Sequence, residues 1–281
     1  MVQKHTESKE SYQELESARA EAKKGYSQAN IKIDQALLEK RLAQSQHMID
    51  LSKIHVDKKW LGALFEAYVA VLKKSKKEIA KALEKLEKGL QRKELDLEIL
   101  TKKVFSFDKK YLEELAQKLS VEVDDLRFLG LRLGNPVFEL YADKLKHRIE
   151  EGKWSKGFCP VCGSSPAMAY LREDDGKRIL WCQFCSTQWS FMRLKCPFCS
   201  NDDQKTLRYF FTDEDDPHRV YVCDRCKRYL KTVDQRKMEN PEDLDLVWEN
   251  LSTLSMDLVA QKEGFISPYS ESKTKNKGVV V

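Results

Sequence analysis

The stretch that decides the fold is residues 159–199, CPVCGSSPAMAYLREDDGKRILWCQFCSTQWSFMRLKCPFC, which holds three Cys-x-x-Cys pairs. A fourth pair, Cys223 with Cys226, follows, and each of the eight cysteines of the 281-residue chain belongs to a pair. A Cys-x-x-Cys turn can present two thiolates to one ion, and four thiolates complete a tetrahedral shell with metal–sulfur distances of about 2.3 Å. The eight cysteines therefore predict two complete metal sites.

The spacing of the pairs predicts which of them share an ion. The chain between the first two pairs, and again between the last two, has the length of a hairpin, whereas only residues 186–195 link the second pair to the third. We therefore expect sequential sites, with an interleaved arrangement as the alternative. The expected ligand sets are Cys159, Cys162, Cys182 and Cys185 for the first ion, and Cys196, Cys199, Cys223 and Cys226 for the second.

The identity of the ion stays open at this point, because four-thiolate tetrahedral sites take either zinc or iron. A competing interpretation treats the CPVC and CPFC pairs as redox-active dithiols, which occur in thioredoxin-like βαβ units. No βαβ pattern surrounds these pairs, and each has a second pair at ribbon spacing. Metal binding is the favoured interpretation.

Hydrophobic periodicity indicates a helical region that precedes the cysteine-rich segment in the sequence. Trp60, Leu64, Tyr68 and Leu72 recur at helical spacing, whereas short apolar runs such as residues 178–181 predict strands. The fold class is therefore α+β. The expected domains are a flexible or partly helical extension over 1–30, a helical domain over 31–152, a tandem four-cysteine ribbon domain over 153–237, a C-terminal helix over 238–266 that packs on the domains, and a flexible tail over 267–281.

A start signal for one of the expected helices stands at Asn135-Pro136. Asparagine is a favoured N-cap residue, and proline fits the first position of a helix. We therefore predict that a helix begins at this dipeptide.

Composition argues against several classes of protein. The formal net charge is only +5, and the basic excess lies within residues 1–150. A nucleic-acid binder usually carries clustered positive charge. Residues 1–16 have no apolar segment typical of an export signal, and no stretch approaches the roughly 18 apolar residues of a membrane span. We expect a cytoplasmic protein without membrane insertion, in which paired cysteines hold metal rather than form disulfides.

The cysteine region resembles the FdhE family of formate dehydrogenase accessory proteins. The most specific motif is Cys-x-x-Cys-x-Thr-x-Trp-x-x-x-Arg-x-x-Cys-x-x-Cys, which this chain matches over residues 182–199. Cys-x-x-Cys-x-x-Tyr-Leu-Lys, matched over residues 223–231, supports it. The resemblance is strong over about 80 residues, and the helical first half fits the family's layout more loosely.

The resemblance implies a helical region followed by two rubredoxin-like, iron-binding modules. It also implies a non-enzymatic maturation or chaperone role in the cytoplasm. The partner would be the immature catalytic subunit of formate dehydrogenase, a molybdenum or tungsten enzyme with a pterin cofactor. All eight cysteines match the family's metal ligands. The other matching positions are candidates for partner binding, namely Thr187, Trp189, Arg193, Tyr229 and Lys231.

Two of these residues also fit simpler structural roles. Trp189 could pack the two modules together, and Arg193 could pair with an acidic neighbour. The alternative functions are a zinc-ribbon protein that binds nucleic acid or acts in transcription, and a small iron or dithiol redox protein. Self-association stays open.

Overall fold

The computed structural model describes residues 2–26, 31–49, 54, 56–75, 77–149, 153–211 and 217–268. The chain divides into two compact units. Unit 1 comprises Met1–Leu38 and Ile49–Tyr141, and unit 2 comprises Glu39–Met48 and Ala142–Val281. Unit 2 thus begins earlier than the border expected near residue 152, and it includes a short segment from the first 50 residues.

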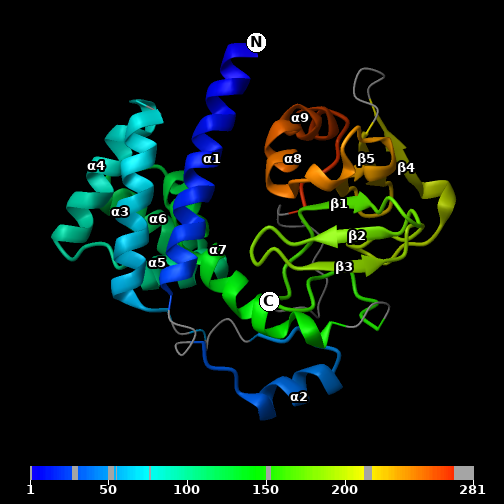
Figure 1. Cartoon of the computed structure of the whole chain (residues 1–281), viewed down its shortest axis with the longest axis horizontal. Coiled ribbons are helices and arrows are strands. Elements are labelled where there is room, and N and C mark those ends of the chain that lie inside the picture. Colours follow the sequence, from blue (N-terminus) through cyan, green and yellow to red (C-terminus); the bar gives the residue numbers. More distant parts are fainter. Residues whose placement is uncertain are drawn as a thin grey trace. The chain divides into compact units, whose positions relative to one another are not determined.

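Unit 1 is built from helices (Figure 1). The helix α1 packs against α3, which also contacts α4 and α5, while α6 contacts α4 and α5. Two further helices, α2 and α7, cross the division between the units. The bounds are α1 Val2–Gly25, α2 Gln35–Ala43, α3 Lys58–Ser75, α4 Lys77–Gln91, α5 Leu97–Phe105, α6 Lys109–Leu119 and α7 Val123–Leu145.

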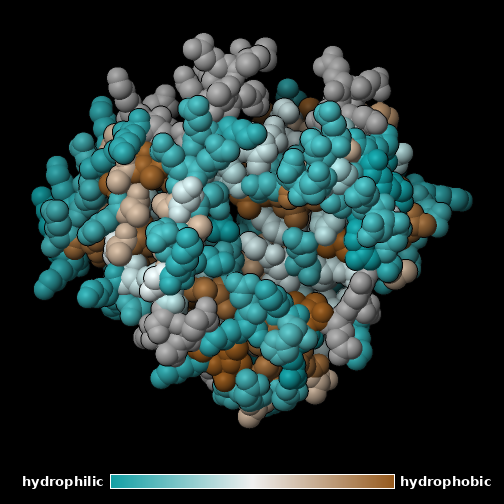
Figure 2. Space-filling model, in the orientation of Figure 1, coloured by the Kyte–Doolittle hydropathy of each residue, from teal (hydrophilic) through white to brown (hydrophobic). Residues whose placement is uncertain are grey.

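Local sequence explains where these helices form. On α3, Leu61, Leu64, Phe65 and Tyr68 are buried at the spacing that gives a helix one apolar face. The Asp96 side chain caps α5 by accepting hydrogen bonds from the backbone N–H groups of residues 98 and 99. The teal at the left edge of Figure 2, over α4, shows that the visible surface of this helix is largely hydrophilic.

The prediction of a helix start at Asn135-Pro136 is wrong, because Pro136 lies inside α7. An interior proline removes one backbone hydrogen bond and costs about 3 kcal/mol. The helix buries Leu129 and Leu133 before the proline and Val137 and Phe138 after it. Since each such side chain contributes about 1.5–3 kcal/mol on burial, packing on both sides of Pro136 outweighs the local cost.

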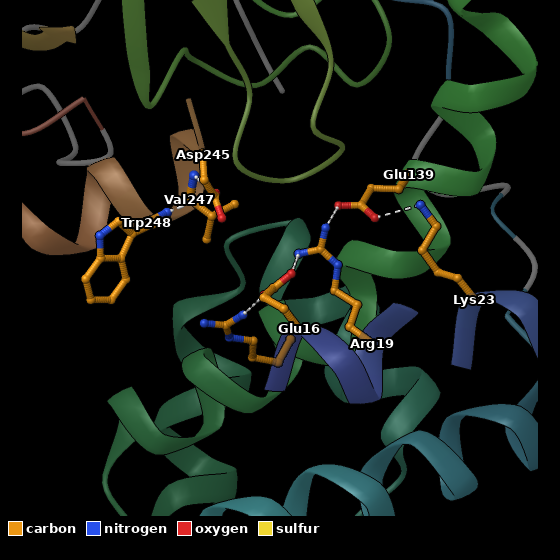
Figure 3. Close-up of polar contacts among 8 residues, drawn as sticks. Glu16, Arg19, Lys23, Glu139, Asp245, Val247 and Trp248 are labelled. Atoms are coloured by element: carbon orange, nitrogen blue, oxygen red, sulfur yellow. Dashed lines mark hydrogen bonds and ion pairs between the residues drawn. The ribbon is translucent and has the colours of Figure 1, made fainter. Parts of the chain in front are cut away.

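The segment 1–30 contains α1, which ion pairs attach to α7 within unit 1. Arg19 Nη2 lies 2.5 Å from Glu139 Oε1, and Lys23 Nζ lies 3.0 Å from Glu139 Oε2 (Figure 3). The Glu139 side chain is 4 % exposed, so a partner for its charge is needed. Two segments more than 100 residues apart in sequence are thereby connected.

Unit 2 contains one six-stranded sheet in the order β3-β2-β1-β6-β5-β4. Adjacent strands are antiparallel except β1 and β6, which pair in parallel with Met168 opposite Lys231. The sheet thus consists of two three-stranded halves joined at β1 and β6 (Figure 1). The strands are β1 Met168–Leu171, β2 Arg178–Trp181, β3 Gln188–Phe191, β4 Leu207–Phe210, β5 His218–Cys223 and β6 Tyr229–Asp234.

The expected C-terminal helix is present as two short helices, α8 (Leu246–Ser252) and α9 (Leu254–Lys262). The Asp245 side chain caps α8 by accepting from the backbone N–H groups of Val247 and Trp248 (Figure 3). Thr253 separates the two helices with φ −100° and ψ 25°. Met256 and Ala260 of α9 pack on a cluster of residues from β5 and β6, so the sheet determines the direction of α9.

Short 3-10 turns join some of these elements. They are η3 Lys146–Arg148, η4 Gln204–Thr206, η5 Gln235–Lys237 and η6 Pro241–Asp243. Within the described residues, every helix is too short or too polar to cross a membrane.

Candidate metal centre

The four Cys-x-x-Cys turns share one backbone geometry. The N–H of the first cysteine donates to the carbonyl of the residue five positions later, at distances of 2.8–3.0 Å. The residue directly after the second cysteine has a positive φ in every turn. A tight reversal after each pair therefore aims both sulfurs to one side. The four residues are Gly163 (φ 79°), Ser186 (54°), Ser200 (58°) and Lys227 (57°).

The sheet brings these turns together two by two. In the first half, one turn precedes β1 and the other connects β2 to β3. In the second half, one turn precedes β4 and the other connects β5 to β6. Strand pairing within each half of the sheet therefore brings the two Cys-x-x-Cys turns of that half together. The sulfurs gather into the groups expected from sequential pairing, Cys159, Cys162, Cys182 and Cys185, and Cys196, Cys199, Cys223 and Cys226.

The distances between sulfurs fit one tetrahedral ion in each group. Cys159 Sγ lies 3.5 Å from Cys185 Sγ, and Cys162 Sγ lies 3.5 Å from Cys182 Sγ. In the second group Cys196 Sγ lies 3.7 Å from Cys226 Sγ, and Cys199 Sγ lies 3.7 Å from Cys223 Sγ. A tetrahedron with metal–sulfur distances of about 2.3 Å has edges of about 3.8 Å, whereas a disulfide requires about 2.05 Å. The residues present therefore fit a four-thiolate metal ion and not a pair of disulfides.

The two groups differ in exposure to solvent. All four cysteines of the first group are buried. In the second group Cys196 and Cys223 are buried, whereas Cys199 and Cys226 are half-buried. An ion in the second group would be closer to solvent and to any partner.

Polar side chains next to the turns contact the sulfurs. Thr187 Oγ1 lies 3.0 Å from Cys185 Sγ, and Ser164 Oγ lies 3.4 Å from Cys162 Sγ. Asn201 Nδ2 donates to Cys223 Sγ at 3.6 Å. Groups of this kind orient metal ligands and tune their basicity. Thr187 is buried, with 7 % of its surface exposed, and its hydroxyl contacts the first cysteine group.

Four close thiols cannot all ionise without a cation. Hydrogen bonds from the other cysteines, beginning with Cys159, hold the pKa of Cys162 well below its usual range. Burial raises the pKa values of Cys182 and Cys185 well above theirs. In the second group the hydrogen bond from Cys196 lowers the pKa of Cys226 to about 5. Since thiolates are the ligands, metal binding must release the remaining protons.

The structure places the other sequence-predicted candidates within unit 2. Trp189 is 3 % exposed, and its Nε1 donates to the carbonyl of Lys156 at 3.1 Å. Tyr229 and Lys231 are also buried. Arg193, by contrast, is exposed to solvent.

The buried Tyr229 and Lys231 attach β6 to α9. Tyr229 Oη donates to Asp257 Oδ1 at 2.8 Å, and Lys231 Nζ lies 2.6 Å from Asp257 Oδ2. Lys231 Nζ also donates to the carbonyl of Asn250 at 2.8 Å. Both side chains thus stabilise the packing of α8 and α9 on the sheet.

Sequence reasoning missed two residues near the second cysteine group. Asn201 occupies the position two residues after the second cysteine of its turn, where Ser164 and Thr187 stand in other turns. That recurring polar residue was a usable signal. Arg178 is 3 % exposed and begins β2, whose residues are all buried. The sequence signal for Arg178 was its position, as a charged residue, at the start of an apolar run.

Comparison with known proteins gives matches over both halves of unit 2. The family model "FdhE, central domain" matches residues 158–193, and "FdhE, C-terminal domain" matches residues 194–270. The two matches meet between residues 193 and 194, which is the link between β3 and the third Cys-x-x-Cys turn.

Individual proteins extend the similarity over most of the chain. "Protein FdhE homolog" from Aquifex aeolicus is 30 % identical over 245 residues, covering 85 % of this chain and 78 % of that protein. "Protein FdhE" from Escherichia coli K12 is 29 % identical over 240 residues, covering 82 % and 70 %. The crystal structure of the FdhE protein from Pseudomonas aeruginosa has the same fold, with a TM-score of 0.61 at 18 % identity over 88 % of this chain and 82 % of that one. On the strength of these matches, the chain belongs to the FdhE family.

Proposed function

We propose that this chain is a cytoplasmic accessory protein of formate dehydrogenase that binds the immature catalytic subunit and assists its assembly or activation. Membership of the FdhE family supports the accessory role. The observation that carries the proposal is the pair of four-cysteine groups built on one continuous sheet. Two such groups make unit 2 a rigid surface on which a partner can be bound.

Each four-cysteine group would hold one iron or zinc ion through its four sulfurs. The ion would cross-link two turns and, if it is iron, also carry one electron between two oxidation states. A full thiolate shell leaves no coordination position for a substrate. The cysteine groups therefore support a binding role rather than an enzymatic one.

Metal content is tested by anaerobic purification followed by elemental analysis and a visible spectrum. We expect two metal ions per chain. Two irons with a rubredoxin-like spectrum that bleaches on reduction would add electron transfer to the role, whereas two zincs without colour would make both sites structural. Substantially less than one ion per chain would contradict the assignment of the ligands.

The accessory role is tested in cells that lack this gene. Formate dehydrogenase activity should be lost in the deletion strain and restored by the wild-type chain. The tagged wild-type chain should also capture the catalytic subunit. Cys162→Ser and Cys226→Ser each leave one group with three thiolates, so neither should restore full activity.

Lys262→Ala serves as the matched control, because Lys262 is exposed at the end of α9. It should restore activity to the wild-type level. Unchanged formate dehydrogenase activity in the deletion strain would refute the proposed function.

A further inference from the structure

A cavity of about 180 Å³ lies beside the second cysteine group. Residues 193–198 form one wall, and β4 and β5 contribute Tyr209 and Tyr221. Cys196 and Cys223 also line it. Five lining residues are lysine or arginine, and none of the lining residues is acidic. The cavity is therefore positively charged and has partly apolar walls.

Arg178 is the buried cation of this cavity. Its guanidinium carbon lies 4.6 Å from the centre of the Tyr221 ring, and its Nη1 donates to the carbonyl of Lys195 at 3.2 Å. Its Nε is buried and has no hydrogen-bond partner among the described residues. Burial lowers the pKa of Arg178 to about 10, which leaves the side chain protonated at neutral pH.

A metal–thiolate group at Cys196 would offset part of this charge, since four thiolates around a divalent ion carry a net charge of about −2. It would not supply an acceptor for a free guanidinium N–H. A buried donor without a partner costs about 1–3 kcal/mol, and more when it is charged. The cavity is therefore complementary to an anion with oxygen acceptors.

Arg193 provides a second cation at the edge of the cavity. It is exposed and forms no ion pair with any residue that the structure describes. The nearby Arg208 differs, because Asp224 accepts from both its Nε and Nη2 at 2.8 and 2.9 Å. Leu194 and Tyr209, which also line the cavity, are 56 % and 50 % exposed. The rim thus combines the cation of Arg193 with apolar surface.

We infer that this cavity receives a carboxylate side chain from an acidic, partly apolar segment of a partner polypeptide. The inference rests on the proposed function, in which that partner is the immature catalytic subunit of formate dehydrogenase. A guanidinium group matches a carboxylate in shape and in hydrogen-bond donors. The volume is below the range of roughly 300–1,000 Å³ for small-molecule sites, and it suits one or two side chains. The exposed rim would be covered by the apolar residues that flank the carboxylate.

The charge distribution favours a polypeptide over a nucleic acid. Nucleic-acid grooves present rows of cations along a phosphate backbone. Here Asp224 pairs with Arg208, so this carboxylate offsets one of the five cations that line the cavity. Arg178 and Arg193, one buried and one at the edge, suit a local acidic group better than a polyanion.

The first experiment measures the dissociation constant between the full chain, with its metal as purified, and the catalytic subunit. Arg193→Glu should weaken binding at least tenfold. Arg193→Lys should stay within about threefold of the wild type, because the charge is kept. Lys262→Glu changes the net charge by the same amount at an exposed residue that does not line the cavity, and it should leave binding unchanged. Wild-type binding by Arg193→Glu would overturn the inference while leaving the proposed function intact.

The second experiment does not depend on the catalytic subunit. The probe peptide acetyl-Leu-Glu-Phe-Glu-Leu-amide is titrated against the full chain, with the lysine version of the peptide as control. We expect binding of the acidic peptide that Arg193→Glu abolishes and Lys262→Glu preserves.

The outcomes separate the two proposals. Binding of the acidic peptide without binding of the catalytic subunit would contradict the proposed function but support the cavity as an acidic-peptide site. No binding of the acidic peptide, or stronger Arg193-dependent binding of a single-stranded oligonucleotide, would overturn the inference.

Discussion

At the scale of single residues, the two cysteine groups offer the same ligands in different surroundings. The first group is fully buried and has the Thr187 hydroxyl 3.0 Å from Cys185 Sγ. The second group leaves Cys199 and Cys226 half-buried. Access of a chelator and retention of the ion should therefore differ between the groups.

We predict that the second group releases its ion first. Treatment of the metal-loaded chain with a chelator should give two kinetic phases, because the half-buried sulfurs admit the chelator sooner. Thr187→Val should accelerate only the slow phase, by about tenfold, since supporting hydrogen bonds contribute about 10–100-fold to metal affinity. Absorbance of a metal-sensitive dye reports the release. A single phase, or an effect of Thr187→Val on the fast phase, would contradict the prediction.

Residue Asp108 gives a pH-dependent effect in unit 1, which contains no cysteine. Its side chain caps α6 by accepting from the backbone N–H of Tyr111, and Lys103 Nζ lies 2.6 Å from it. The hydrogen bond from Lys103 lowers the pKa of Asp108 in the folded state. The stabilisation by this carboxylate is therefore present above its unfolded pKa of about 3.9, and it is lost as the pH falls through the folded value.

The matched variant is Asp108→Asn, which keeps a capping oxygen and removes the charge. The wild type should be the more stable of the two at pH 7, and the difference should shrink as the pH falls below about 4. Helix unfolding in urea, followed by circular dichroism at several pH values, measures it. A difference that does not change with pH would show that the charge of Asp108 has no role.

At the scale of elements, Lys231 connects the central strand β6 to α8 and α9. It is 3 % exposed and contacts Asp257 of α9 and the carbonyl of Asn250 of α8. A buried charge held by such partners is costly to disrupt, because the remaining groups lose their compensation. The packing of the two helices on the sheet should therefore depend strongly on this side chain.

We predict that Lys231→Ala lowers the free energy of unfolding of unit 2 by about 3 kcal/mol. Urea unfolding of the metal-loaded chain, monitored by tryptophan fluorescence, gives the value. Lys262→Ala, at an exposed position of the same helix pair, should change it by less than about 0.5 kcal/mol. Equal stability of the Lys231 variant and the wild type would mean that apolar packing alone holds α8 and α9.

At the scale of the whole molecule, the chain forms two units with separate means of stabilisation. All eight cysteines lie in unit 2, whereas unit 1 relies on an apolar helical core and on ion pairs such as those of Glu139. Metal binding is coupled to folding where the ion cross-links the chain. Loss of metal should therefore act on one unit.

Removal of metal should destabilise unit 2 and leave unit 1 folded. After chelation, hydrogen exchange measured by mass spectrometry should show lost protection in β1–β6 and retained protection in α3, α5 and α6. The metal-loaded chain under the same conditions is the control. Equal loss of protection in both units would show that they fold as one cooperative body.

Much of the candidate site was readable from the sequence because its determinants are local. A Cys-x-x-Cys turn is defined within six residues, and the lengths between turns match hairpins, so the ligand groups could be predicted from spacing. The α+β class followed from periodicity for the same reason. Pro136 shows the limit of local signals, since burial of residues on both sides of it decides that α7 continues.

The sequence by itself determined the two ligand groups, the order of helical and cysteine-rich regions, and the family. Only the tertiary structure decided that β1 and β6 join the two halves of the sheet, that Tyr229 and Lys231 hold α9, and that Arg178 is buried in a charged cavity. The physical reason is distance along the chain. Each of these features depends on groups at least 17 residues apart, such as Arg178 and the Lys195 carbonyl, which only packing brings together.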